Sequence, residues 1–513
     1  MPDSGTERSE MPTLFSALRT HVPVVKKPKQ QANLQPYGLE MMVNPQALRK
    51  KKKKKKKRIY KLSLEQRFRR INRSRAKSEI IVIGAGFAGL SAAYELSSVG
   101  YKVTVLEGQK RSGGRVETLR KLIPRRVTEG GAELIGSNHH AWLSYKRQFH
   151  LHFTDVLEPP NAPVILGGWR LSSAEAAVLG AEFLKATGIL DREARSVNAD
   201  TPWLSPNARA LDRLSLADRV KDLPVSQLCK LALTEQLVTD NGVPAEHQSY
   251  LGVLAMIKGG GCKSYWEDSE VYRCREGNDE LAKRFQEKLQ KRSVRTHFNS
   301  RVTRINLERR PIEVTLASGQ KLTADDIVLA VPPSVWDKVR ITPALPARYK
   351  GQFGKNVKFL MNVQNNAWHP LSPALTTDGP VDLTWQGTDQ QNGPRASFVC
   401  FSGSKDAVTC RGWKNRRMAY LACMNGVYPE IARGMRATKF MDWIDNEWTK
   451  GSYSFPAPGE VTTTAPLLRK AFRGRLHFAG EHTCNAFVGY MEGALQSGLR
   501  VAEALARRDK VIV

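Results

Sequence analysis

The sequence lacks the patterns that mark a disulfide-rich, zinc-binding or membrane-spanning chain. Its seven cysteines are scattered and odd in number, with no CxxC pair among them. This argues against a disulfide framework or a zinc site and favours a reducing compartment such as the cytoplasm. No window of about 18 apolar residues occurs, so we expect no transmembrane segment. With 41% apolar and 25% charged residues, the composition is ordinary for a globular protein.

Acidic residues are few compared with basic ones, and the imbalance is concentrated at the N-terminus. The chain has 80 Lys/Arg against 49 Asp/Glu, a formal net charge of +31. Residues 1–78 hold 22 of the basic and 5 of the acidic residues, including the uninterrupted run Lys50–Lys57. Adjacent ammonium groups repel one another, so we expect residues 1–78 to be a disordered basic leader. A solvated tail without a specific partner is the favoured interpretation. An anionic partner (nucleic acid, membrane or acidic protein) and a nuclear location stay open.

The leader runs into the stretch Glu79–Leu90, EIIVIGAGFAGL. Basic residues before an apolar run can mark a secretory signal, but acidic Glu79 and the spaced glycines argue against one. The alternative is a buried strand, Ile80–Ile83, that turns into a helix through a GxGxxG motif. The first glycine of such a turn allows a tight bend, the second admits a pyrophosphate, and the third lets the helix pack closely on the strand. These glycines are Gly84, Gly86 and Gly89.

A second strand follows the helix and ends in an acidic residue, as a dinucleotide site requires. Residues 87–97 predict the helix, whose N-terminus offers N–H donors to phosphate, and Lys102–Leu106 predicts the strand. Glu107 is then placed to accept hydrogen bonds from a ribose, which disfavours NADP. Gly113-Gly114-Arg115 gives another close backbone approach and a guanidinium for phosphate or the edge of a flavin. At this point both FAD and NAD stay open.

The remaining sequence alternates between helical and strand patterns, without an internal repeat. Residues 160–270 show apolar spacing typical of helices, and residues 294–331 show spacing typical of strands. These patterns predict an α/β protein in which a discontinuous Rossmann-like domain carries an inserted α+β substrate-binding domain. After the leader (1–78), we expect the dinucleotide domain at 79–160, 271–335 and 448–513, and the substrate domain at 161–270 and 336–447.

Several separated motifs resemble those of the flavin-containing amine oxidase family. This family includes monoamine oxidases, polyamine oxidases, L-amino acid oxidases and histone-lysine demethylases. The resemblance covers most of residues 79–505 and implies that the Rossmann-like domain binds FAD. The motifs are IVIGAGFAGLSAAYEL, VTVLEG and SGGRV near the N-terminus, EGGAELIG, REGNDELAKRF, SRVTRI and ADDIVLAVPPSVW in the middle, and GRLHFAGEHTCNAFVGYMEGALQSGLRVAEAL near the C-terminus.

The resemblance also assigns contacts to the cofactor. It implies that Val302 meets the adenine through its backbone. Gly480 and Glu481 are expected against the pyrophosphate or ribityl chain, and Tyr490 and Met491 at the flavin ring. The helix that begins there then directs its positive end toward the pyrimidine end of the flavin, which favours the reduced cofactor.

Other residues near these motifs are expected to play smaller parts. Ser452 stands where monoamine oxidases carry the cysteine that bonds to FAD, and a hydroxyl forms no such thioether. We therefore expect noncovalent FAD. Cys484 is expected to be a small buried residue. His139, His140 and His482 are expected to be loop residues rather than metal ligands.

Three residues are expected to carry the chemistry. Lys358 stands ten residues before Trp368, the setting of the family's flavin-facing lysine. By resemblance, it holds a water at flavin N5 and assists the reaction of reduced flavin with oxygen. Tyr453 and Tyr490 match the paired aromatic residues in front of the flavin, where two rings hold an amine by cation–π attraction.

The resemblance implies oxidation of an amine to an imine, which water hydrolyses, while oxygen is reduced to hydrogen peroxide. An L-amino acid oxidase, for aromatic or basic amino acids, is the first alternative. The segment GGAELIGSNHH lacks the arginine that such enzymes use for the α-carboxylate, although Arg273 or Arg395 can still serve. We expect Glu133 to be an exposed glutamate, with attraction of a distal ammonium as the weaker interpretation.

Two further alternatives concern the class of protein. An anion-binding protein with a non-catalytic flavin domain would make the basic leader the functional part of the chain. A carotenoid- or porphyrinogen-type desaturase shares the fold, but the retained lysine and tyrosines argue against it. The oligomeric state stays open.

Overall fold

The computed structural model describes residues 63–68, 70–157 and 162–512, all of which lie within one compact unit spanning Gly38–Val513. Most of the predicted leader, including the lysine run, lies outside the described residues. Residues 63–68 and 70–78 differ from the prediction of disorder. Here α3 (Leu64–Arg67) buries Leu64 completely, and the N–H of Leu64 donates to the buried carboxylate of Glu95 at 2.8 Å. This capping bond and the buried leucine hold the segment on the domain, despite its basic composition.

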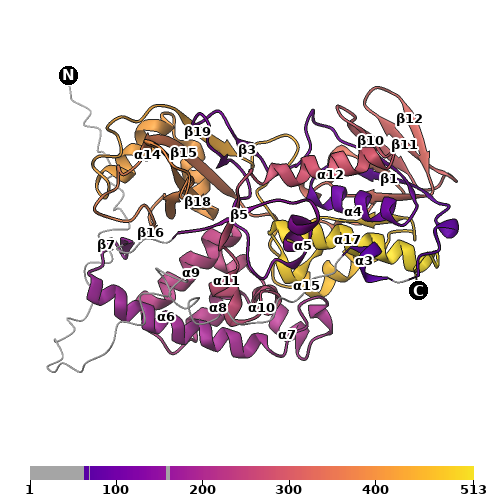
Figure 1. Cartoon of the computed structure of the whole chain (residues 1–513). Coiled ribbons are helices and arrows are strands. Elements are labelled where there is room, and N and C mark those ends of the chain that lie inside the picture. The colour runs from indigo at the N-terminus through magenta and orange to yellow at the C-terminus, as the bar shows by residue number, and fades with distance from the viewer. Residues whose placement is uncertain (1–62, 69, 158–161, 513) are drawn as a thin grey trace, which may run out of the picture. The chain divides into compact units, whose positions relative to one another are not determined.

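A five-stranded parallel sheet lies on one side of this unit (Figure 1). Four of the five residues of its central strand are buried, because both faces of the sheet are covered. Its strands come from three separate parts of the sequence. Their order is β20 (Leu476–Phe478), β13 (Asp326–Leu329), β1 (Glu79–Ile83), β2 (Lys102–Leu106) and β9 (Arg295–His297).

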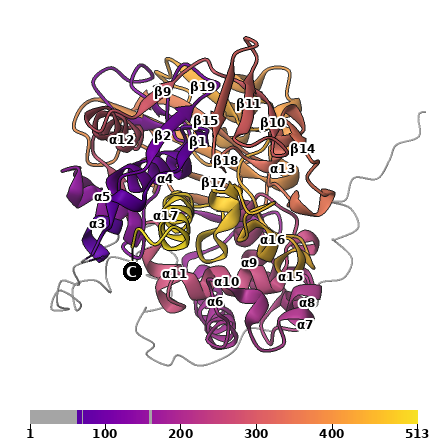
Figure 2. The same cartoon turned by 90° about the vertical axis from the view of Figure 1, so that its right-hand side faces the viewer.

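Helices cover one face of the parallel sheet, and a smaller sheet covers the other (Figure 2). The central helices pack backbone to backbone, since a Cβ added at Gly498 would lie 2.3 Å from the carbonyl oxygen of Ala88. The helices are α4 (Phe87–Ser98), α5 (His140–Gln148), α12 (Asp279–Lys291) and α17 (Met491–Arg508). The smaller sheet has the order β12 (Lys321–Ala324), β11 (Ile312–Leu316), β10 (Val302–Asn306) and β14 (Arg340–Thr342).

A seven-stranded sheet forms a second part of the unit. Its longest pair, β15 and β18, runs antiparallel in continuous register from Asn356↔Gly403 to Gln364↔Arg395. Two helices, α13 (Ser404–Gly412) and α14 (Arg416–Asn425), pack with this sheet. The strand order is β19 (Thr438–Asp442), β15 (Asn356–Gln364), β18 (Arg395–Gly403), β17 (Leu383–Gln386), β16 (Leu375–Thr377), β6 (Val164–Leu166) and β7 (Trp169–Arg170).

A group of helices follows β7 in the sequence and ends before β8. The longest begins with a capping box, in which Ser172 and Glu175 satisfy each other's backbone N–H groups. The group comprises α6 (Ser173–Ala194), α7 (Ala208–Arg213), α8 (Leu216–Lys221), α9 (Gln227–Asn241), α10 (Tyr250–Gly259) and α11 (Lys263–Asp268). The remaining short elements are β3 (Thr118–Leu119), β4 (Thr128–Glu129), β5 (Phe153–Asp155), β8 (Tyr272–Cys274), α15 (Glu460–Thr463) and α16 (Ala465–Leu468).

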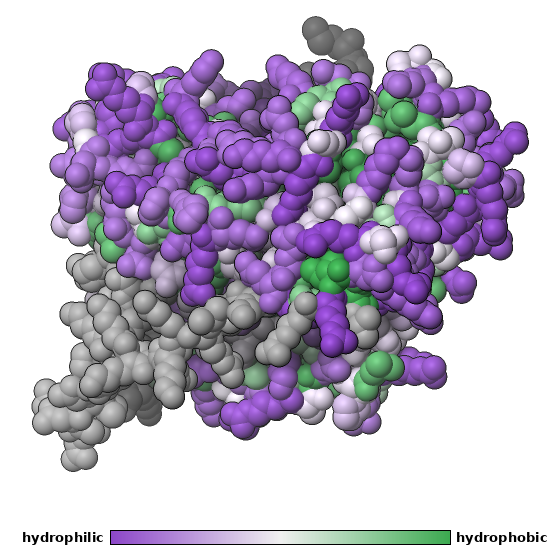
Figure 3. All heavy atoms as spheres, turned by 45° about the vertical axis from the view of Figure 1, so that its right-hand side comes forward, coloured by the Kyte–Doolittle hydropathy of each residue, from purple (hydrophilic) through white to green (hydrophobic). Residues whose placement is uncertain are grey.

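The predicted fold class is confirmed, since a discontinuous parallel sheet of the Rossmann type is combined with a mixed α+β part. The predicted domain boundaries stay a prediction, because contacts group all described residues into one unit. In the face shown in Figure 3, hydrophilic side chains dominate and apolar ones form small separate patches. No helix in the described part of the chain is long and apolar enough to cross a bilayer.

Candidate functional site

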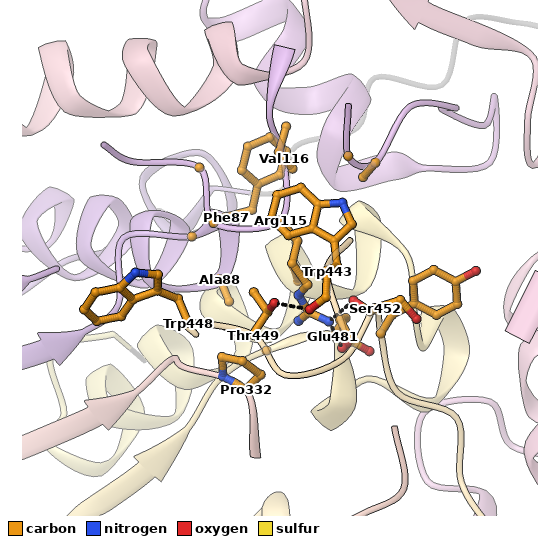
Figure 4. Close-up of a pocket in the computed structure, with 18 of the residues that line it drawn as sticks. Phe87, Ala88, Arg115, Val116, Pro332, Trp443, Trp448, Thr449, Ser452 and Glu481 are labelled. Carbon is orange, nitrogen blue, oxygen red and sulfur yellow. Dashed lines mark hydrogen bonds and ion pairs between the residues drawn. The ribbon is translucent and has the colours of Figure 1, made fainter. Parts of the chain in front are cut away.

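A cavity of about 400 Å³ is lined by residues of both the parallel sheet and the seven-stranded sheet. Figure 4 shows a close-up of its wall. Its wall includes every site residue expected from the sequence except Gly89, which packs beneath the turn. These wall residues are Gly84, Gly86, Glu107, Gly114, Arg115, Val302, Lys358, Tyr453, Gly480, Glu481, Tyr490 and Met491. Segments more than 400 residues apart in the sequence thus meet around one space.

The glycines of the first turn differ in what surrounds them. Gly84 has a φ of +105°, which favours glycine, and a Cβ there would lie 3.0 Å from the carbonyl oxygen of Ala330. A Cβ on Gly89 would lie 1.9 Å from the carbonyl oxygen of Gly84, so only glycine lets α4 approach the turn. At Gly86 a Cβ would meet no atom within 4 Å. The middle glycine therefore leaves open space on the cavity wall, where a pyrophosphate is expected.

Glu107, at the end of β2, is buried beside this turn. Its Oε2 accepts the N–H of Ala85 at 2.7 Å, and its Oε1 accepts the N–H of Gln109 at 2.8 Å. Burial raises the pKa of Glu107, although these backbone donors and Arg111 oppose the shift. The two hydrogen bonds fix the carboxylate at the cavity wall, and a carboxylate oxygen has a further lone pair for a ribose hydroxyl.

An ion pair joins the first nucleotide loop to the C-terminal motif. Arg115 Nη1 donates to Glu481 Oε1 at 2.9 Å and to the carbonyl oxygen of Ser452 at 2.8 Å (Figure 4). Glu481 also accepts from the hydroxyl of Ser454 at 2.6 Å and from the N–H of Gly489 at 2.9 Å. Burial alone would raise the pKa of Glu481, but the charge of Arg115 and these donors outweigh it, and the pKa is lowered. The carboxylate therefore stays ionised and holds several segments together.

Two long helices begin at the cavity. The first residue of α4, Phe87, and the first residue of α17, Met491, both line the wall. Neither helix has a side-chain cap at its N-terminus, so the positive ends of both helix dipoles are available to an anionic ligand. Val302, the first residue of β10, lines the part of the wall near Glu107.

The two expected tyrosines come together from different loops. A Cβ on Gly489, which precedes Tyr490, would lie 3.3 Å from Cδ2 of Tyr453. The hydroxyl of Tyr453 donates to the backbone oxygen of Asp240 at 2.6 Å. Tyr490 packs edge-on against the His139 ring, with 5.3 Å between centroids. Tyr453 is thus held by a residue of the cavity wall, and Tyr490 by a ring behind the wall.

Lys358 lies on β15 and is buried, with a partner that the sequence did not suggest. Its Nζ donates to the carbonyl oxygen of Gly131 and to Glu133 Oε2, both at 2.9 Å. The prediction that Glu133 is exposed is therefore wrong: the residue is 5% exposed. Arg273 Nε also donates to Glu133, at 2.8 Å. Two cations already neutralise this carboxylate, so it is a poor site for the ammonium of a substrate.

Acidic residues that the sequence analysis missed line the cavity near the tyrosines. Asp240 lies at the end of α9, and Glu270 lies just before β8. Burial raises the pKa of Asp240 to about 6, and the hydrogen bond from Gln236 opposes the shift. Burial and then the charges of Asp240 and Glu270 raise the pKa of Tyr453 well above its ordinary value. No local pattern marks either residue, because each reaches the cavity only through the packing of helices.

The sequence analysis also missed two tryptophans that follow β19, the last strand of the seven-stranded sheet in chain order. Trp443 and Trp448 lie on the cavity wall with Thr449 (Figure 4). The ring of Trp448 occupies the space beside Gly108, where an added Cβ would lie 2.2 Å from Cζ3. Their position shortly before Ser452 was the available signal.

Three other kinds of side chain were expected to play small parts near the cofactor motifs. Ser452 donates its hydroxyl to Asn356 Oδ1 at 2.7 Å. Cys484 is 4% exposed, and burial raises its pKa to about 12, so the expectation of a small buried residue is confirmed. The histidines differ from expectation in part: His139 precedes α5 as its non-helical N-cap, whereas His140 is the first residue of α5 and His482 lies in a 3₁₀ turn, Glu481–Thr483.

The wall residues fit a dinucleotide that carries a large ring. The open side of Gly86 and two uncapped helix N-termini suit phosphate groups and an anionic ring. The carboxylate of Glu107 suits a ribose. Lys358 and the two tyrosines line the same cavity, whose volume of about 400 Å³ leaves space for an aromatic ring and a small substrate.

Comparisons with known proteins agree with this geometry. The family model described as flavin containing amine oxidoreductase matches residues 87–506. Probable flavin-containing monoamine oxidase A of Dictyostelium discoideum is 23% identical, over 85% of this chain and 98% of that protein. (S)-6-hydroxynicotine oxidase of Paenarthrobacter nicotinovorans is 26% identical, over 82% and 97%. The solved structure of cyclohexylamine oxidase from Brevibacterium oxydans IH-35A has a TM-score of 0.75 and 26% identity, over 84% and 99%.

Proposed function

Because the chain belongs to the family of flavin-containing amine oxidoreductases and its cofactor is FAD, we propose that it oxidatively deaminates a primary or secondary amine. One amine, one oxygen molecule and one water give an aldehyde or ketone, hydrogen peroxide, and ammonia or a smaller amine. The observation that carries this proposal is the single cavity in which the glycine turn meets Lys358, Tyr453 and Tyr490. A cofactor site and an amine site are then parts of one space.

When bound, FAD supplies the redox chemistry by accepting a hydride equivalent from the α-carbon of the amine. The chain's own residues orient the reactants. Tyr453 and Tyr490 present rings that attract a cationic amine and confine its approach. The N-terminus of α17, at Met491, places positive potential on the cavity wall, which favours the negative charge that a reduced flavin would carry. Lys358 offers an ammonium that can hold a water or polarise oxygen at the cavity wall.

Negative charge beside the two tyrosines of the cavity wall favours an amine over an amino acid as substrate. Asp240 and Glu270 place negative charge beside the tyrosines, which attracts an ammonium and repels an α-carboxylate. The two arginines suggested for a carboxylate are engaged elsewhere. Arg273 is paired with Glu133 and Asp389, and Arg395 donates to the side chain and backbone of Asn362. The amino acid oxidase alternative therefore has less support.

We further propose that FAD is held without a covalent bond. Ser452 lies on the wall but carries a hydroxyl that is engaged with Asn356. Cys484 is a buried thiol that donates to Gln496 Oε1 at 3.7 Å and is not a wall residue. Acid precipitation should release all the flavin into the supernatant. Flavin that stays on a tryptic peptide would contradict the proposal.

The decisive experiment is anaerobic mixing of the purified flavoprotein with matched pairs of amines and amino acids. Phenethylamine with phenylalanine, and cadaverine with lysine, keep the side chain constant while adding the carboxylate. We expect the amines to bleach the flavin absorbance faster, with hydrogen peroxide formed once oxygen is admitted. Faster bleaching by the amino acids would favour the oxidase alternative, and no bleaching by either would contradict the proposed function.

A chain shortened to begin at residue 63 tests the proposal that the basic leader is the functional part. If the shortened protein turns over amines as the full chain does but loses its action in cells, the anion-binding interpretation gains support. If the shortened protein and the full chain have the same effect in cells, the anion-binding interpretation is contradicted.

A further inference from the structure

Two of the three ammonium hydrogens of Lys358 form hydrogen bonds within the described residues. One is donated to the carbonyl oxygen of Gly131 and one to Glu133 Oε2. The ammonium also lies 5.3 Å from the centre of the Trp385 ring, a cation–π distance. Because Lys358 lines the cavity, the third hydrogen is left for a water or ligand there. The orientation of this lysine therefore depends on its partners.

Glu133 is the partner that makes the most contacts. Its Oε2 accepts from Lys358, while its Oε1 accepts from Arg273 Nε at 2.8 Å and from Trp385 Nε1 at 2.9 Å. The backbone oxygen of Glu133 accepts the side-chain amide of Asn278 at 2.8 Å. With both carboxylate oxygens and its backbone engaged, the side chain has one orientation.

The charges around Glu133 balance. Arg273 bridges Glu133 and Asp389, so two cations and two anions form one buried cluster. Burial alone would raise the pKa of Glu133, but Lys358 and then Arg273 outweigh it and lower the pKa. Asp389 contacts Arg273 but not Lys358, and it also accepts the N–H of Leu157. The cluster thus has one anion at the lysine and one at a distance from it.

We propose that Glu133 is the positioning residue of Lys358: its Oε2 holds the ammonium in one orientation at the cavity wall. This inference rests on the proposed function. Without the carboxylate, Lys358 would keep only the Gly131 carbonyl and would face Arg273 without an intervening anion. The two cations would repel each other, so the ammonium would be displaced from its position at the cavity wall.

Glu133→Gln and Asp389→Asn form a matched pair for the test. Each replaces a carboxylate by an amide of the same shape and removes one negative charge from the cluster. Only Glu133→Gln removes the charged partner of Lys358. Competitive labelling of the holoenzyme with acetic anhydride, read at the Lys358 peptide, reports how firmly its partners hold this amine. At pH 8 we expect labelling to rise by at least about tenfold for Glu133→Gln, which loses a hydrogen bond between two charged groups, and by less than about threefold for Asp389→Asn.

Kinetics supply the second measurement. Glu133→Gln should slow reoxidation of the reduced flavin by oxygen. In a double-mutant cycle with Lys358→Met, the two losses should overlap rather than add. Glu133→Asp should restore part of the rate because it restores the charge.

Three results would overturn the proposal: equal labelling of Lys358 in the two amide variants, additive losses in the cycle, or unchanged reoxidation in Glu133→Gln. If Glu133→Gln does not fold, Trp385→Phe, which removes the indole N–H that donates to Glu133 Oε1, takes its place in the same measurements, with smaller changes expected. Labelling does not require turnover. A wild-type protein that oxidises no amine would therefore contradict the proposed function while still testing the link between Glu133 and Lys358.

Discussion

The two ends of the cavity are built in different ways. At the nucleotide end, glycines between Gly84 and Gly114 line the wall, and the Arg115–Glu481 ion pair joins this stretch to the C-terminal motif. At the substrate end, side chains from separate elements converge, among them Lys358, Asp240 and Tyr453. The first end depends on local chain geometry, whereas the second depends on how helices and sheets pack.

This difference separates binding from chemistry. A pyrophosphate needs N–H donors and close backbone approach, which a short local motif supplies. Oxidation of an amine needs charges and rings at set positions, and these come from whichever elements reach the cavity. Changes at the nucleotide end should therefore act on stability and flavin content, and changes at the substrate end on rates.

The largest effect is expected within the glycine turn itself. Gly89→Ala forces a Cβ within 1.9 Å of the Gly84 carbonyl oxygen and should cost at least about 3 kcal/mol of unfolding free energy. Gly86→Ala meets no protein atom within 4 Å and should change the stability of the flavin-free protein by less than about 1 kcal/mol, while reducing the flavin retained. Urea unfolding and the flavin-to-protein absorbance ratio measure both. Equal destabilisation would show that Gly86 serves packing.

The Arg115–Glu481 ion pair at the nucleotide end should matter next most. Glu481→Ala leaves Arg115 without its carboxylate and removes the acceptor used by Ser454 and Gly489. We expect a loss of about 3–5 kcal/mol in unfolding free energy, with loss of flavin. Glu481→Gln, which keeps an acceptor, is the control and should lose less. A stable Glu481→Ala protein that retains its flavin would contradict this role for the ion pair.

At the substrate end, Lys358→Met should act on one half-reaction. We expect reoxidation by oxygen to slow by about tenfold or more, roughly 1.4 kcal/mol in the barrier. Reduction of the flavin by amine should change less. Stopped-flow absorbance with amine, and then with oxygen, measures the two steps separately. Lys355→Met, at an exposed position just before the same strand, is the control. Unchanged reoxidation would remove Lys358 from the site.

The smallest effect is expected from Asp240 and depends on pH. The pKa of Asp240 in the folded protein, about 6, lies above its ordinary value of 3.8. Its contribution to stability is therefore fully present below pH 3.8 and is lost as pH rises through 6. Attraction of a cationic amine depends on pH in the opposite way. It strengthens as pH rises through 6, because it needs the ionised carboxylate of Asp240.

The KM of Asp240→Asn relative to wild type should therefore rise between pH 5 and 7. We expect a change of roughly fivefold, or about 1 kcal/mol. Asp222→Asn, on the surface at the end of α8, should show no such trend. Steady-state KM values for one amine at each pH provide the measurement. A constant ratio across this range would show that Asp240 does not contact the substrate.

Much of the fold follows from patterns that depend on neighbouring residues. The strand–turn–helix at Glu79–Ser98 and the second strand with Glu107 were predicted within one or two residues. The prediction was wrong at 63–68 and 70–78, because the buried bond from Leu64 to Glu95 has no local signal. It was also wrong for Glu133, whose charge suggested exposure. Two cations from distant strands make burial of this carboxylate favourable.

By itself the sequence determined the nucleotide turn, the interrupted parallel sheet and the family, because glycine spacing and apolar periodicity act over a few residues. Only the tertiary structure decided the partners of Lys358 and the acidic lining from Asp240 and Glu270. Charges separated by more than a hundred residues meet only after the elements have packed. Their ionisation then depends on burial and neighbours, which no local pattern of residues specifies.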